Sequence, residues 1–133
     1  MLAAVLHDFN HLVLEDVPEP GLGEVLVRIV ACGICATDYK ALVGIRRNVT
    51  FPFVPGHESS AVVARVGPGV LHFKEGDEAI CQPSGYCGYC THCRTGNTHY
   101  WEWGTQATVC SAHSDRMICA ERRACTKPPS VLH

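Results

Sequence analysis

Short apolar segments separated by proline and glycine turns constrain the fold of this chain more than any other feature. In residues 24–33, "EVLVRIVACG", Val25, Val27 and Ile29 fall on one face of an expected strand. A further strand is expected at 58–66, "ESSAVVARV", and the glycines and proline of 67–69 follow it as a turn. Many short strands with frequent turns predict a mainly β barrel or sandwich.

The remaining elements fit the same class of fold. Residues 1–6 and 11–17 predict a hairpin, and "FKEGDEAIC" holds a turn before another strand. The pattern at 37–44 favours one short helix, with Thr37 or Asp38 as its N-cap. Beyond residue 104, "TQATVC" and "DRMICAE" predict weaker strands, and "TKPPSV" an extended exit. With only one short helix expected, a parallel α/β sheet is not favoured.

Composition narrows the class of protein. The chain has 133 residues, which suits one domain, and a formal net charge of −2. No basic stripe suggests nucleic acid, no apolar run is long enough to span a membrane, and residues 1–10 do not resemble a signal peptide. Nine cysteines is an odd number, which a disulfide framework would not favour. We therefore expect a reducing, cytoplasmic environment in which several cysteines bind metal.

Two cysteines, Cys32 and Cys35, have the spacing of a redox pair or of half a zinc site. A thioredoxin-like pair needs a βαβ context, which this stretch lacks. Asp38 follows closely enough to orient a metal ligand. Taken alone, the motif is as consistent with two buried thiols as with a metal site.

A histidine and a glutamate, His57 and Glu58, are adjacent just before a predicted strand. A lone histidine there is more often structural than catalytic. Because an imidazole and a carboxylate both suit zinc, the neighbouring glutamate makes a metal site the better hypothesis.

Three evenly spaced thiols, Cys87, Cys90 and Cys93, look like most of a second metal site. A closed zinc site needs four ligands, so this cluster lacks one.

The stretch "GPGVLH" at 67–72 begins like a dinucleotide-binding fingerprint, but its sixth residue is His72 and the pattern predicts no helix after it. We interpret it as a tight turn.

The combination and order of these motifs, from Cys-Gly-Ile-Cys-Ala-Thr-Asp through Gly-His-Glu to "FKEGDEA", resembles the zinc-dependent medium-chain alcohol and polyol dehydrogenases. The resemblance runs from residue 1 to about Tyr100. It implies that residues 1–133 form a GroES-like catalytic domain, a distorted β-barrel with a short helix and a cysteine-rich metal-lobe loop at about 84–104. The nucleotide-binding domain that brings NAD or NADP in this family is not within these residues.

The resemblance also implies roles for individual residues. Cys35 and His57 would bind the catalytic zinc, Thr37 would begin a proton relay from the substrate hydroxyl, and Asp38 would hold His57 in its tautomer. The family offers two roles for Glu58. In polyol-type members the matching glutamate binds zinc together with water, whereas in others a cysteine from beyond His133 binds instead. We expect Cys35, His57, Glu58 and water.

The implied activity is oxidation of an alcohol or polyol to a carbonyl, in a full-length protein that is a homo-oligomer in this family. The isolated chain is expected to be inactive, since the cofactor carries the hydride. The alternative is a non-enzymatic zinc-binding module that has lost the cofactor domain. The stretch after Trp101 departs from the family pattern, and Cys110, Cys119 and Cys125 are read as ordinary thiols.

In the family's lobe motif a fourth cysteine lies eight residues after the third, which here is Trp101. An indole has no lone pair for a metal. We expect an empty or weakly held lobe site, with His99 as the next ligand to consider and three thiolates plus water as a further option. His92 is badly placed, and Cys110 would need the loop to fold back.

Overall fold

The computed structural model describes residues 1–18, 25–47, 49–83, 85–100, 112–114, 116–119 and 124–126. Its elements, in chain order, are β1 (Leu2–Asp8), β2 (His11–Asp16), β3 (Val25–Gly33), α1 (Ala36–Leu42), β4 (Glu58–Val66), β5 (Glu78–Cys81), α2 (Thr91–Arg94), the 3₁₀ turn η1 (Thr98–Tyr100), β6 (Arg116–Cys119) and β7 (Ala124–Thr126). The prediction of a mainly β fold is confirmed.

The predicted N-terminal hairpin is confirmed as β1 paired antiparallel with β2. Asn10 turns the chain at a φ of 58°, a conformation that asparagine tolerates better than most residues. The outer edge of β1 is tied to two later segments: Leu6 exchanges backbone hydrogen bonds of 2.8 and 3.1 Å with Phe53, and Ala4 N–H donates to His113 at 2.8 Å. These bonds join the hairpin to the segments around the site described below.

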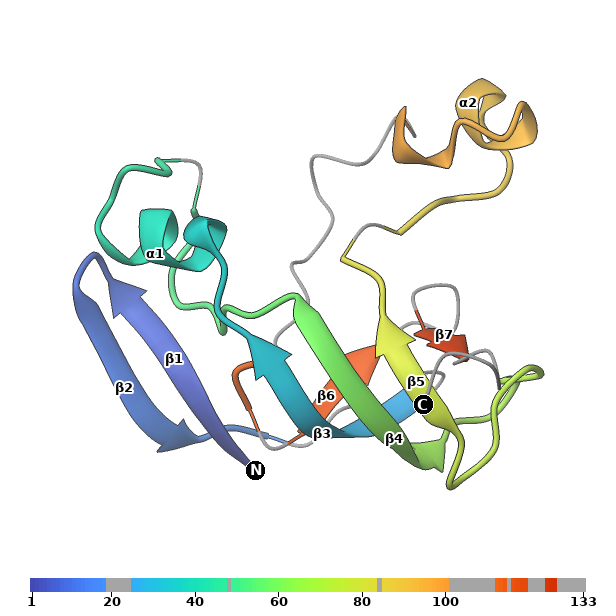
Figure 1. Cartoon of the computed structure of the whole chain (residues 1–133), viewed down its shortest axis with the longest axis horizontal. Helices are drawn as coiled ribbons and strands as arrows, with labels where there is room; N and C mark the ends of the chain where they lie inside the picture. Colours follow the sequence, from blue (N-terminus) through green and yellow to red (C-terminus); the bar gives the residue numbers. More distant parts are fainter. Residues whose placement is uncertain are drawn as a thin grey trace.

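The larger sheet has five antiparallel strands in the order β6-β3-β4-β5-β7 (Figure 1). The long strands β3 and β4 form its centre, and their register places Gly33 opposite Glu58. Two register shifts, between Leu26 and Val27 and between Ile29 and Ala31, bend this pair. Because β3 and β4 run antiparallel, the residues after β3 and those before β4 come to the same end of the sheet.

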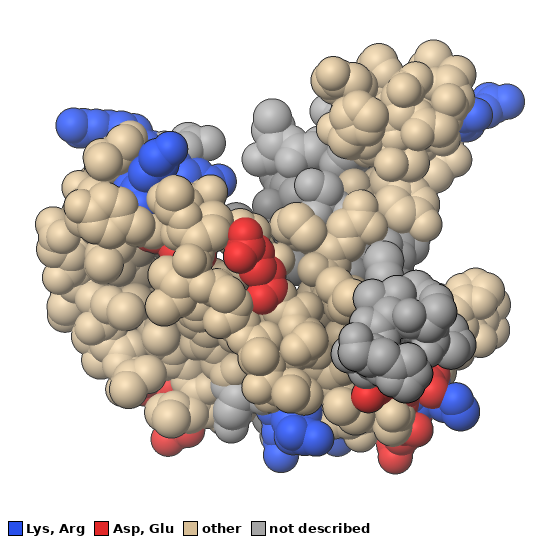
Figure 2. Space-filling model, viewed as in Figure 1, with Lys and Arg blue, Asp and Glu red and all other residues tan. Residues whose placement is uncertain are grey.

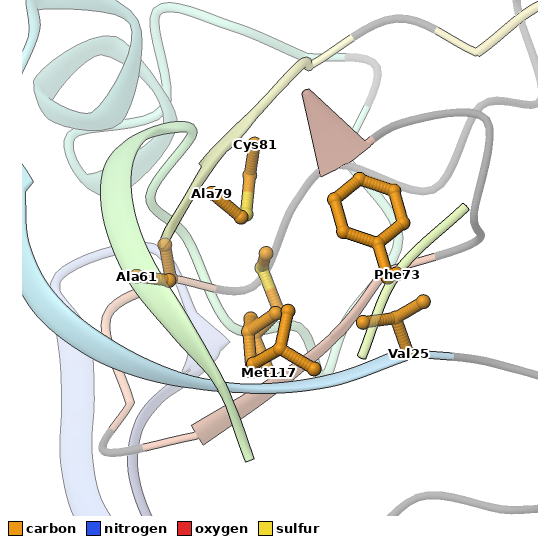
Figure 3. Packing of buried hydrophobic residues seen from close by; sticks show 9 residues of the cluster. Val25, Ala61, Phe73, Ala79, Cys81 and Met117 are labelled. Carbon is orange, nitrogen blue, oxygen red and sulfur yellow. The ribbon is translucent and has the colours of Figure 1, made fainter. Parts of the chain in front are cut away.

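The core lies on one face of the sheet and joins Val25, Val27, Ala61, Val63, Phe73, Ala79, Cys81, Ala112 and Met117 (Figure 3). Val25 and Val27, which the alternation placed on one face of β3, are fully buried, so that face is the inner one. Leu26 is also buried, although the alternation puts it on the other face, so the exposed face begins only at Arg28. Burial of this apolar set is the main source of stability for the sheet.

The helix α1 forms where predicted, but its N-cap is Cys35 rather than Thr37 or Asp38. The Cys35 sulfur accepts the Thr37 N–H, and the Asp38 carboxylate accepts the Cys35 N–H, which is a capping box with a thiol in the usual hydroxyl position. The short α2, η1 and β7 were not predicted. Residues 105–110, predicted as a strand, lie outside the described residues.

The cysteine-rich loop stands away from the sheet in Figure 1, with α2 and η1 at its tip, while α1 and the β1–β2 hairpin lie on the opposite side. In Figure 2, Lys and Arg gather over α1 and the segment after it, whereas the lower edge carries both basic and acidic residues. No helix among the described residues is long and apolar enough to cross a membrane.

Candidate metal centre

A thiol, an imidazole and a carboxylate meet at the end of the β3–β4 pair. Cys35 follows β3, His57 immediately precedes β4, and Glu58 is the first residue of β4. The Cys35 sulfur lies 3.2 Å from His57 Nε2. The ligand atoms of Cys35, His57 and Glu58 all lie within 4.8 Å of one another. The antiparallel pairing of two strands therefore brings together residues that the sequence separates widely.

The Cys35 sulfur is held by the start of α1. It accepts the Thr37 N–H at 3.1 Å, while the Cys35 N–H donates to Asp38 Oδ2 at 3.0 Å. These two bonds fix the side chain and the backbone of the same residue.

The carboxylate of Asp38 lies behind the imidazole of His57. Its Oδ1 is 3.5 Å from His57 Nδ1 and accepts the Gly56 N–H at 3.1 Å. The Asp38 side chain is only 9% exposed. A buried carboxylate at Nδ1 favours the tautomer in which Nε2 carries the free lone pair, and Nε2 is the atom that faces Cys35.

A second histidine, His113, reaches the same carboxylate, and sequence reasoning missed it. His113 Nε2 lies 3.9 Å from Asp38 Oδ2, and its backbone N–H donates to Pro55 at 3.0 Å. A Cβ on Gly56 would come within 2.7 Å of the His113 nitrogen, so glycine is needed for this close approach. His113 belongs to no motif and lies far along the chain, so no sequence signal could have found it.

Glycine is also needed where Glu58 approaches β3. A Cβ on Gly33, which pairs with Glu58, would come within 2.7 Å of Glu58 Oε2 and 3.3 Å of its Cβ. The absence of a side chain at Gly33 thus leaves room for the glutamate to turn toward Cys35 and His57.

Cys32 is separate from this group, although its spacing from Cys35 suggested a pair. Its thiol donates to the Gly33 carbonyl at 3.5 Å. Burial raises the pKa of the Cys32 thiol, and a backbone hydrogen bond from Glu58 only partly opposes this. The neutral thiol is therefore favoured, and among the described residues the metal-ligand group at this place does not include Cys32.

The second cluster lies in the lobe, where the sulfur atoms of Cys87, Cys90 and Cys93 lie within 4.8 Å of one another. The sulfurs of Cys87 and Cys93 are 3.7 Å apart. The pKa of the Cys93 thiol is raised, first by desolvation and then by the two neighbouring thiols, against a lowering backbone bond from Gly88.

His99 does not join this group within the described part of the lobe, and its ring packs at a tilt of 48° against that of Tyr100, with centroids 4.3 Å apart. Trp101 and Cys110 lie outside the described residues, as do the side chains of Cys119 and Cys125. For these last two the structure gives only strand positions, in β6 and β7.

The donor set at Cys35, His57 and Glu58 fits zinc, which binds thiolate, imidazole and carboxylate. Ligands about 2.3 and 2.1 Å from one tetrahedral ion are themselves roughly 3.5 Å apart. The measured sulfur–nitrogen distance of 3.2 Å is close to that value.

Comparison with known proteins agrees with the fold. The family described as the alcohol dehydrogenase GroES-like domain matches residues 21–129. The chain belongs to this family. The distorted β-barrel with a short helix and a cysteine-rich loop, expected from the sequence, is therefore confirmed as the GroES-like fold.

Individual family members cover nearly the whole chain. An alcohol dehydrogenase of Moraxella sp. (strain TAE123) is 40% identical over 122 residues, which are 86% of this chain and 33% of that protein. The crystal structure of an alcohol dehydrogenase from Aeropyrum pernix superposes with a TM-score of 0.84 and 29% identity, over 99% of this chain and 41% of that one.

A cobalt- and zinc-bound thermostable alcohol dehydrogenase from Pyrobaculum aerophilum gives a TM-score of 0.83 and 29% identity, over 98% of this chain and 42% of that one. The chain thus spans about a third of the length of the curated relatives it matches, 33% in the case of the Moraxella protein.

Proposed function

We propose that this chain is the catalytic domain of a zinc-dependent, NAD(P)-linked dehydrogenase that oxidises an alcohol or polyol to a carbonyl. The observation that carries the proposal is the convergence of Cys35, His57 and Glu58 within 4.8 Å, with Asp38 behind the imidazole. These three side chains would hold zinc together with water. Zinc, when bound, stabilises the negative charge that develops on the oxygen of the substrate alcohol.

The protein residues around this point orient the site and move the proton. Asp38 fixes the direction in which His57 presents Nε2. Thr37 is the second residue of α1, is half-buried and lies two residues after Cys35, so its hydroxyl would be the first acceptor of the substrate proton.

Hydride transfer needs a nicotinamide cofactor, and no strand followed by Gly-x-Gly-x-x-Gly occurs in the 133 residues. We therefore expect residues outside this chain to supply NAD or NADP binding. An alcohol or polyol substrate and a homo-oligomeric state are predictions that rest on the family resemblance, and a cytoplasmic location is a prediction that rests on the cysteine content.

The test has two parts. Cobalt(II) added to the 133-residue chain should give the absorption of a thiolate-bound ion. Cys35→Ser should reduce that absorption to the part that comes from the lobe thiols, while the matched Cys32→Ser variant keeps all of it. A chain whose zinc content is unchanged by Cys35→Ser would show that the ligand assignment is wrong.

For activity, the chain should be joined to the nucleotide-binding part of the Moraxella relative and assayed for NAD(P)H formation with a panel of alcohols. The isolated chain should show none. If the metal site is intact but the joined protein is also inactive with every alcohol, the alternative of a non-enzymatic zinc-binding module is favoured.

A further inference from the structure

The three-cysteine cluster of the lobe is a site distinct from the one proposed for catalysis, and it differs in its donors. It offers sulfur only, from Cys87, Cys90 and Cys93, whereas the other site offers sulfur, nitrogen and oxygen. No further His, Cys, Asp or Glu side chain joins the three thiols within the described residues 85–100.

The backbone of the lobe holds these thiols in place without any ion. The Cys90 N–H donates to the Cys87 sulfur at 3.3 Å, and the Cys93 N–H donates to the Cys90 sulfur at 3.5 Å. These N–H···S bonds hold the sulfurs of Cys87 and Cys90, and the Cys93 sulfur lies 3.7 Å from that of Cys87. The fold thus brings the three sulfurs together as a set of ligands.

Burial separates the three ligands into two kinds. Cys87 and Cys90 are 9% and 7% exposed, while Cys93 is only partly buried. Cys93 is therefore the ligand that solvent and an incoming ion can reach. The cluster combines two sheltered sulfurs with one accessible sulfur.

The spacing of the sulfurs does not by itself choose a metal. Sulfurs about 2.3 Å from one ion are roughly 3.8 Å apart in a tetrahedral arrangement and roughly 4.0 Å apart in a trigonal one. The measured 3.7 Å between Cys87 and Cys93 is near both values. The number and softness of the donor atoms must therefore decide which metal ion the cluster binds.

From these observations we infer that the lobe cluster is a three-thiolate site for a soft metal ion that needs only three sulfur ligands. Copper(I) is an ion of this kind, and it is the probe used in the experiment below. Structural zinc sites are almost always closed by four protein ligands, and this cluster has three in the described chain. Soft thiolate ligands select copper(I) as well as zinc, so a three-sulfur cluster shifts the balance toward copper(I). The inference does not depend on the proposed dehydrogenase function.

The experiment is an anaerobic titration of the zinc-loaded 133-residue chain with copper(I) in competition with bicinchoninate. The expected result is one copper(I) per chain, with an X-ray absorption spectrum that shows three sulfur neighbours. Changing a residue that only supports a ligand lowers metal affinity roughly tenfold to a hundredfold. Cys93→Ser removes a ligand, so it should lower the copper(I) affinity by more than that. Cys32→Ser and Cys35→Ser, which alter thiols outside the lobe, should leave it unchanged.

Two further variants decide between three and four ligands. Trp101→Cys supplies a fourth thiol, and it should convert the lobe to a site that keeps zinc against the competing copper(I). Cys110→Ser should change nothing. If Cys110→Ser instead lowers zinc affinity, or if the unaltered chain holds a lobe zinc as firmly as Trp101→Cys does, the cluster has four ligands and the inference is overturned. A spectrum with nitrogen or oxygen neighbours overturns it without relying on any variant.

Discussion

Asp38 Oδ1 lies 3.5 Å from His57 Nδ1, on the side of the imidazole opposite Cys35. The same carboxylate accepts the backbone N–H groups of Cys35 and Gly56 at 3.0 and 3.1 Å. One buried aspartate therefore connects the loop after β3 to the loop before β4. It positions the thiol and the imidazole with respect to each other.

Replacing Asp38 should weaken metal binding more than it weakens the fold. We expect Asp38→Asn to lower zinc affinity by roughly tenfold to a hundredfold, since an amide cannot hold the imidazole tautomer as a carboxylate does. Zinc competition with a chromogenic chelator measures this. The matched control is Asp77→Asn, a carboxylate bound to Lys74 in a turn away from the site; equal losses in both variants would contradict the role given to Asp38.

A methyl group at Gly33 should move Glu58 out of the metal site. The added Cβ would lie 2.7 Å from Glu58 Oε2, a flexible side-chain end that can swing away. We expect Gly33→Ala to reduce zinc affinity as much as Glu58→Gln does, with a similar urea midpoint.

The double variant of Gly33→Ala and Glu58→Gln identifies the cause. If the glycine acts through the glutamate, the two losses will not add. Additive losses of zinc affinity would show that Gly33 acts by another route.

The sequence predicted the parts of the fold that rest on strong local patterns. The alternation of Val25, Val27 and Ile29 indicated β3, and the motifs around Cys35 and His57 pointed to one site. The N-cap of α1 was predicted wrongly, because a thiol is not among the usual capping groups and only its N–H···S geometry identifies it.

What the sequence could not predict depends on contacts between distant segments. His113 approaches Asp38 because its backbone bonds to Pro55 and follows the edge of β1, and no local pattern encodes either contact. The same applies to Gly33, whose importance appears only when the register sets it opposite Glu58. Sequence reasoning finds ligands by their chemistry, whereas neighbours that position them need the register.

Ser59 should be replaceable by alanine with a gain in stability. It is 4% exposed, pairs with Cys32 and Cys81 across β3 and β5, and is the one buried side-chain oxygen without a hydrogen-bond partner among the described residues. Removing an unsatisfied hydroxyl should raise the free energy of unfolding by about 1 kcal/mol. Urea unfolding of Ser59→Ala measures the change, and a loss of stability would mean that the hydroxyl has a partner.

The turn before β5 should lose stability in acid. The side chain and backbone of Lys74 hold the pKa of Asp77 below its usual value. A lowered folded pKa means that the stabilisation is fully present above the unfolded pKa and is lost as pH falls through the folded one. Carboxyl NMR titration should show the low pKa, and Lys74→Met should raise it part of the way. Glu75→Gln is the neighbouring control, and an equal shift in that variant would rule out Lys74 as the cause.

The lobe should lose its zinc first when a chelator is added. We expect one chelator-resistant zinc per chain, at Cys35, His57 and Glu58, because metal binding stabilises a lobe only when its ligand set is complete. The count should not change in His99→Ala, since that imidazole does not join the three sulfurs in the described lobe.

After chelation the lobe thiols should oxidise. The Cys87 and Cys93 sulfurs lie 3.7 Å apart, so hydrogen peroxide should convert the accessible Cys93 thiol to a sulfenic acid, and the Cys87 thiol should displace water from it to form a disulfide. Mass spectrometry of the digested chain would show a Cys87–Cys93 link, and thiol counting would show the loss of two thiols. Copper(I) or Trp101→Cys with zinc should protect both cysteines. If the unaltered chain instead keeps a second zinc through chelation and resists peroxide, its lobe is closed by a ligand other than these three thiols.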